Sequence, residues 1–164
     1  MTYLTYFNSK FIAHRGLFNG PNPQTENSPT QIMHALALGF DVEIDLWCVD
    51  SKYYLGHDGP VYHIPQEFLR MAGLWVHAKN IDALSKLSHP YYEMVNYFWH
   101  ENDAVTLTSK NFIWTYPGQQ LLPNAIAVMP EMHMDYNEAH NLKCAGYCSD
   151  YIATIRNNLL PNLK

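Results

Sequence analysis

The sequence has 164 residues, a length typical of one domain, and its 48% apolar content with 12 Tyr, 7 Phe and 4 Trp excludes a disordered chain. Ten Lys and Arg against fifteen Asp and Glu give a net charge of −5. The basic residues form no cluster, which argues against a nucleic-acid-binding surface. We therefore expect a single packed domain over residues 1–164.

The chain begins with a predicted strand followed by a predicted helix. Residues 11–14 form a short apolar run typical of a buried strand, and a loop rich in Gly, Asn and Pro ends it. Ser28 followed by Pro29 predicts the start of a helix, because Ser caps helices and Pro is favoured at their first position. Gly39 predicts the end of this helix.

The next segment, DVEIDLW at residues 41–47, alternates apolar and acidic residues. This period of two predicts a strand on which Glu43 and Asp45 share one face. Further strands are predicted at KYYLGHD (52–58) and LWVHAK (74–79), and short helices at PQEFLRMAG (65–73) and NIDALSKL (80–87), the second with Asn80 as its cap.

The second half of the chain contains more predicted strands than helices. Its predicted elements are a strand at MVNYFWH (94–100), a hairpin at AVTLTSKNFIWTY (104–116), a strand at NAIAVMP (124–130), and a strand leading into a helix at AGYCSDYIATIRNNL (145–159). Strands that alternate with helices favour an α/β fold around a parallel sheet.

The cysteines and the hydropathy pattern indicate the compartment. Cys48, Cys144 and Cys148 form no CxxC pair, which predicts free thiols in a reducing compartment. Residues 1–13 lack the basic and long apolar regions of a leader peptide, and no run reaches the roughly 18 apolar residues of a membrane span. We expect a cytoplasmic protein without a transmembrane segment.

Ionisable residues follow the predicted strands at the points where the strands end. In a parallel sheet these ends lie at one edge, where α/β proteins build their ligand sites. The residues concerned are His14, Arg15, Glu43, Asp45, His57, Asp58, His77, Lys79, His100, Glu101 and Glu131.

These residues divide by chemical role. Two carboxylates on one strand face suit a hard cation such as Mg²⁺ or Ca²⁺, and histidines can transfer protons near neutral pH. Arg15 and Lys79 can bind an anion. Metal ligands, an acid–base pair and anion-binding groups together indicate cleavage of a phosphoester. Trp99, Trp114 and Tyr116 are interpreted as packing residues.

The segments AHRG, TENS, GFDVEIDL and LGHD, in this order, resemble the glycerophosphodiester phosphodiesterase family, whose pattern is His-Arg-Gly, Glu-Asn-Thr, Glu-x-Asp and His-Asp. The resemblance covers residues 11–60 and part of WVHAK. It implies a TIM-type barrel, a divalent cation, a small phosphodiester substrate and a place in lipid metabolism. The implied roles are general acid and base for His14 and His57, phosphate binding for Arg15 and Lys79, metal binding for Glu43 and Asp45, and support by Glu26. From their places at predicted strand ends, we add Asp58 and His100 as supporting residues.

The chain departs from the family at the third strand. The family has Glu-x-Lys there, and this chain has His77-Ala78-Lys79, so the third carboxylate ligand is missing. His77 could bind the metal instead, which would favour Mn²⁺ or Zn²⁺. Alternatively, Glu131 could supply the oxygen from another strand.

The chain is also short for the implied fold, because a complete (β/α)₈ barrel usually takes about 250 residues. We therefore expect a shortened or incomplete TIM-type barrel of about seven strands, with few helices in its C-terminal half. Such a barrel is either trimmed to its strands and loops or open, with its edge covered by another subunit in a homo-oligomer.

The sequence thus predicts a metal-dependent phosphodiesterase that cleaves a glycerophosphodiester or a related phosphodiester. Two alternatives stay open. One is a non-catalytic module that binds a phosphorylated ligand or partner. The other is the cyclising reaction of the related sphingomyelinase D enzymes, in which a substrate hydroxyl attacks the phosphorus.

Overall fold

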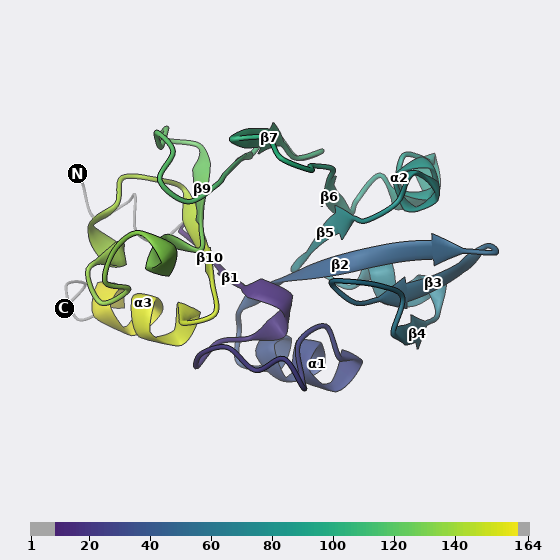
Figure 1. Cartoon of the computed structure of the whole chain (residues 1–164), viewed down its shortest axis with the longest axis horizontal. Helices are drawn as coiled ribbons and strands as arrows, with labels where there is room; N and C mark the ends of the chain where they lie inside the picture. Colours follow the sequence, from purple (N-terminus) through teal and green to yellow (C-terminus); the bar gives the residue numbers. More distant parts are fainter. Residues whose placement is uncertain (1–8, 161–164) are drawn as a thin grey trace.

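The computed structural model describes residues 9–160, whose strands form one mixed sheet of ten (Figure 1). The prediction that the chain has no leader peptide concerns residues 1–13, and residues 1–8 of this segment lie outside the described range. The strands are β1 (Lys10–Ala13), β2 (Asp41–Val49), β3 (Lys52–Leu55), β4 (Tyr62–Ile64), β5 (Leu74–Ala78), β6 (Asn96–Phe98), β7 (Val105–Leu107), β8 (Ile113–Thr115), β9 (Ala125–Val128) and β10 (Gly146–Ser149).

Most neighbouring strands of the sheet are parallel. The parallel path runs β6-β5-β2-β1-β10-β9-β8, while β3, β4 and β7 join it antiparallel to their neighbours. The long strand β2 lies at the centre: Asp41 and Val42 pair with β1, Val42–Leu46 pair with β5, and Leu46–Val49 pair with β3. The parallel strands therefore end at a common edge of the sheet.

The prediction of a TIM-type barrel is wrong, because the sheet is open. Among residues 9–160, β6 and β8 do not pair, and the edge of β8 is taken by the antiparallel strand β7. Side-chain contacts replace strand pairing across this gap: Ser109 exchanges hydrogen bonds with the Tyr97 backbone, Thr106 Oγ1 donates to Trp99 O at 2.8 Å, and Phe98 stacks on Trp114. With three residues each, β6, β7 and β8 are too short to build the staggered ladder that closes a barrel.

The structure contains less helix than an α/β barrel requires. Three α-helices, α1 (Pro29–Ala37), α2 (Ile81–Leu87) and α3 (Ile152–Leu159), lie outside the curved sheet (Figure 1). The other connections in the described range are loops and 3₁₀ turns, and the helix predicted at 65–73 is such a turn, η3 (Gln66–Arg70). Within residues 9–160, strand–helix alternation is thus confined to three places.

Two helix starts confirm the predictions from capping residues. Ser28 Oγ accepts a hydrogen bond from Gln31 N at 3.3 Å, and Asn80 Oδ1 accepts one from Ala83 N at 3.0 Å. Each satisfies a backbone N–H that has no partner inside its helix. The hairpin predicted at 104–116 is also confirmed, as the pair β7–β8. The three cysteines are free, as predicted.

The two faces of β2 differ in chemistry, although both are buried. Val42, Ile44 and Leu46 are completely buried in the main core, on the side covered by the helices. Glu43 and Asp45 point to the opposite face, as the alternation predicts, and are 3% and 1% exposed. Each fully buried aliphatic side chain contributes about 1.5–3 kcal/mol, so the apolar face fixes the position of the acidic one.

No helix in the described part of the chain combines the length and the apolar character needed to cross a bilayer.

Candidate active site

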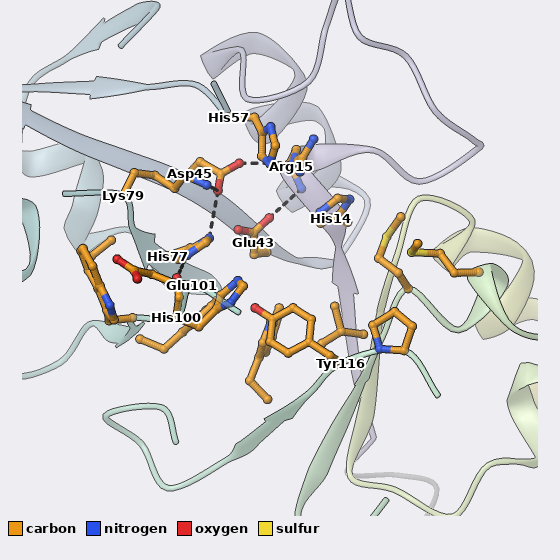
Figure 2. A pocket seen from close by; sticks show the side chains of 18 residues that line it. His14, Arg15, Glu43, Asp45, His57, His77, Lys79, His100, Glu101 and Tyr116 are labelled. Carbon is orange, nitrogen blue, oxygen red and sulfur yellow. Dashed lines mark hydrogen bonds and ion pairs between the residues drawn. The ribbon is translucent and has the colours of Figure 1, made fainter. Parts of the chain in front are cut away.

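A cavity of about 470 Å³ lies where the parallel strands end (Figure 2). Strands β1, β2, β5, β6, β8 and β9, or the residues directly after them, contribute to its wall. The cavity is lined by eight residues that the sequence predicts to act in catalysis, in metal or phosphate binding, or in support of these roles. They are His14, Arg15, Glu43, Asp45, His57, His77, Lys79 and His100.

Glu43, Asp45 and His77 form a buried group that could hold a metal ion. One potential ligand atom from each residue lies within 4.8 Å of the other two. The strand register explains this proximity, because β2 and β5 are parallel neighbours and Asp45 lies directly opposite His77. Two carboxylates and one imidazole make a donor set suited to a divalent cation.

Asp45 is the most heavily bonded member of this group. Its Oδ1 contacts His77 Nδ1 at 3.0 Å and Lys79 Nζ at 3.5 Å. Its Oδ2 accepts a hydrogen bond from Asn27 Nδ2 at 2.9 Å and pairs with Arg15 Nε at 3.2 Å. Burial by itself would raise the pKa of Asp45, but the His77 hydrogen bond and the surrounding cations outweigh it and hold the pKa well below its usual range. Asp45 is therefore ionised at neutral pH.

Glu43 has few donors around it. The backbone N–H of Arg15, a residue in the left-handed conformation with φ 51°, donates to Glu43 Oε2 at 3.1 Å. Burial and the neighbouring charge of Asp45 raise the pKa of Glu43. A cation between the two carboxylates would offset this repulsion.

The ring of His77 is held on both faces. It stacks on Phe98, with centroids 5.1 Å apart, and on His100, at 4.5 Å. Its Nε2 faces the backbone carbonyl of His100 at 3.4 Å, the kind of outer contact that orients metal-binding histidines. Its Nδ1 then faces the carboxylate of Asp45.

His14 is paired with a carboxylate from the far end of the chain. Its Nδ1–H donates to Asp150 Oδ1 at 2.8 Å, which leaves Nε2 available to the cavity. Burial lowers the pKa of His14, but the hydrogen bond to Asp150 and the charge of Glu43 outweigh it and raise the pKa above its ordinary value. His14 therefore holds a proton more readily than a free histidine.

His57 has the same kind of partner in a different environment. Its Nδ1 lies 2.7 Å from Asp58 Oδ1 on the loop that follows β3. The side chain of Asp58 is 94% exposed, whereas that of Asp150 is 8% exposed. Both histidines therefore present Nε2 to the cavity, one from a buried pair and one from a solvated pair.

Two of the remaining predicted residues lie behind the cavity wall or away from it. Glu26 Oε2 pairs with Arg15 Nη1 at 3.2 Å and so orients the guanidinium. Glu131 lies outside the buried metal-binding group: its carboxylate accepts hydrogen bonds from Ser149 Oγ at 2.9 Å and from Asp150 N at 3.0 Å. Of the two alternative third ligands, the structure thus brings His77, and not Glu131, to Glu43 and Asp45.

Reasoning from the sequence missed two residues and underrated a third. Asn27, fully buried, binds both the carboxylate and the backbone N–H of Asp45. Asp150 orients His14, and Tyr116, interpreted as packing, lines the cavity. A signal existed for Asp150, because it directly follows β10 and so obeys the strand-end rule that identified His14.

Replacing Asn27 by Ala should lower the free energy of unfolding by about 3 kcal/mol. The change leaves the buried backbone N–H of Asp45 without a partner. It also places Ala in the left-handed conformation of residue 27, at φ 58°, where the Cβ is unfavourable and no side-chain hydrogen bond compensates. Asn27→Gly is the matched control, because Gly accepts this φ, and it should be less destabilised by about 1 kcal/mol. Urea unfolding measures both. Equal stability of Asn27→Ala and the parent would contradict the role of this side chain.

Asp150→Asn should lower the pKa of His14, because the amide oxygen can still accept the Nδ1–H while the negative charge is lost. Any activity that needs protonated His14 then declines at lower pH than in the parent. NMR titration of the histidine ring protons measures the pKa directly, with Asp82→Asn, an exposed acid outside the cavity, as the control. An unchanged pKa of His14 in Asp150→Asn would show that this charge does not act on the ring.

Comparison of the chain with protein-family models, with curated proteins and with solved structures finds no match. The case for a function therefore rests on the geometry and the chemistry of the cavity.

Proposed function

We propose that the protein is a metal-dependent phosphodiesterase of the glycerophosphodiester phosphodiesterase type. One observation carries the proposal: a single cavity collects a buried carboxylate–imidazole group, two histidines with Nδ1 bound to a carboxylate, and the cations of Arg15 and Lys79. Proton transfer and charge neutralisation at a phosphodiester need these three kinds of group together. The motifs in residues 11–60 support the same reaction.

The residues present fit a divalent cation. Glu43 and Asp45 supply oxygen, His77 supplies nitrogen, and the raised pKa of Glu43 marks a site where a positive charge is favourable. Of the cations considered, Mn²⁺ and Zn²⁺ suit this mixture best, because both accept carboxylate and imidazole ligands, whereas Ca²⁺ and Mg²⁺ prefer oxygen alone. Mn²⁺ is the probe used below. The bound cation would stabilise negative charge on the phosphoryl oxygens.

The two histidines divide the proton transfers between them. The raised pKa of His14 suits the general acid, which protonates the leaving alcohol through Nε2. His57, on the more exposed loop, accepts a proton from the attacking hydroxyl or water. Asp150 and Asp58 hold the two rings with Nε2 turned to the cavity. The Arg15 guanidinium and the Lys79 ammonium bind the phosphate.

One observation favours a second candidate, a non-catalytic module that binds a phosphorylated ligand. The carboxylate of Asp45 already contacts four protein donors, including Arg15 and Lys79, so a binding site could be stable without a cation. Calorimetric titration with Mn²⁺ separates the two candidates, because only the enzyme needs to bind the metal.

The test of the proposed function is ³¹P NMR of glycerophosphodiesters incubated with the protein and Mn²⁺, Mg²⁺ or Ca²⁺, and with a chelator. We expect cleavage with Mn²⁺ and none with the chelator. A phosphomonoester product identifies hydrolysis, and a cyclic phosphate identifies attack by a substrate hydroxyl. Phosphate binding without Mn²⁺ binding and without cleavage would support the non-catalytic module instead.

A further inference from the structure

Three residues that line the cavity carry a buried polar atom without a hydrogen-bond partner among the described residues: Nε of Arg15, which forms an ion pair with Asp45, and the hydroxyl of Tyr116 and Nδ1 of His100, which do not form one. The rings of Tyr116 and His100 are in contact, with centroids 4.2 Å apart. Most buried polar groups in proteins are paired, so two adjacent unpaired ones need an explanation. Both side chains belong to the residues that surround the cavity in Figure 2.

The position of the two atoms relates them to the metal-binding group. His100 stacks on His77, a member of the metal-binding group, with ring centroids 4.5 Å apart. Tyr116 directly follows β8, and His100 follows β6 after Trp99. The pair therefore bridges the two strands that the open sheet leaves unpaired, beside the place where a phosphoryl group would lie.

The wall behind the pair is apolar and buried. Phe98 and Trp114, both 2% exposed, stack with centroids 4.6 Å apart, and Val128 lies next to them in the same buried cluster. In an apolar wall of this kind, the few polar atoms determine which ligand groups are accepted. Here these atoms are one hydroxyl and one imidazole nitrogen.

The two groups offer complementary hydrogen bonds to a ligand. The tyrosine hydroxyl can both donate and accept a hydrogen bond, and the imidazole nitrogen offers one further bond. A ligand hydroxyl, which also both donates and accepts, satisfies the pair.

We propose that Tyr116 and His100 form the subsite for the alcohol part of the substrate and determine specificity by requiring a free hydroxyl on it. This inference rests on the proposed function for the position of the phosphate. A ligand without the hydroxyl leaves both buried atoms unpaired, and a site built around a hydrogen bond rejects such an analogue more strongly than an apolar pocket rejects a smaller group.

The test compares two phosphates of similar size that differ in their hydroxyls, glycerol 3-phosphate and n-propyl phosphate. Calorimetric titration of the full chain with Mn²⁺ present should show about tenfold tighter binding of glycerol 3-phosphate. Tyr116→Phe removes one oxygen and keeps the ring, and should reduce this preference to about threefold or less. His100→Phe keeps the ring stack and should reduce it similarly.

Tyr97→Phe is the matched control, because Tyr97 lies on β6 but does not line this cavity, and its preference should equal that of the parent. The inference is overturned if the parent binds both phosphates equally, or if both variants keep the full preference. It is also overturned if the variants weaken both ligands equally, since the two groups would then contact the phosphoryl oxygens.

The binding experiment tests the hydroxyl subsite independently of the phosphodiesterase proposal. A tenfold preference that is lost in the variants supports the subsite even if no phosphodiester is cleaved, in which case the non-catalytic module is the better description of the protein. Cleavage without any preference refutes the subsite and leaves the phosphodiesterase proposal intact. Thermal unfolding of each variant confirms that the chain is folded.

Discussion

At a Mn²⁺ concentration about one hundred times its dissociation constant, we expect the free energy of unfolding to rise by about 2.7 kcal/mol. For a chain of this size the rise corresponds to an increase of about 5–10 °C in Tm. The physical reason lies in the buried pair Glu43 and Asp45, whose mutual repulsion a cation removes only in the folded state. Differential scanning calorimetry with and without the metal measures the effect.

Glu43→Gln should abolish this stabilisation. The variant keeps the size and the acceptor for Arg15 N but loses the charge that attracts the cation. Without metal, the variant should be at least as stable as the parent, because a buried charge next to Asp45 is gone. Glu93→Gln is the control, since Glu93 is exposed and does not line the cavity. If Mn²⁺ stabilised Glu43→Gln as much as the parent, the assignment of the metal site would be refuted.

The second large effect is expected at His14. His14→Gln should lower kcat for a glycerophosphodiester by about 10²–10⁴-fold, the usual contribution of general acid–base catalysis. Gln has the reach to accept or donate hydrogen bonds but cannot carry the proton that the leaving alcohol needs. Because His14 is not part of the metal-binding group, the variant should retain the stabilisation by Mn²⁺. This combination separates loss of chemistry from loss of the site.

The control for this prediction is His63→Gln, an exposed histidine on β4 outside the cavity, which should keep the kcat of the parent. Steady-state kinetics at saturating Mn²⁺ provides the comparison. If His14→Gln retained kcat within about twofold of the parent, His14 would not be the general acid, and the proton would have to come from another group.

The local elements of the fold were predictable from the sequence, and its closure was not. Ser28 and Asn80 cap their helices through contacts three residues away, so short patterns suffice to locate them. Whether the sheet closes depends on pairing between β6 and β8, which no local pattern records. Strands of three residues carry too little periodicity to show how their neighbours are arranged.

The residues of the candidate site were also predictable in part. His14, Glu43 and His57 follow from short motifs and from the rule that polar residues at strand ends meet at one edge. The partner of His14 lies 136 positions away, so the pairing with Asp150 depends on β1 and β10 lying side by side. The order of motifs along the chain cannot reveal such a contact.

The two histidine–carboxylate pairs should respond differently to ionic strength. Exposed charge pairs are screened by dissolved salt, whereas buried pairs are screened much less. Asp58 is almost fully exposed and Asp150 is buried, so added salt weakens the orienting contact of His57 while that of His14 persists. Of the two proton-transfer steps, the one assigned to His57 is therefore the one that the ionic composition of the surroundings can tune.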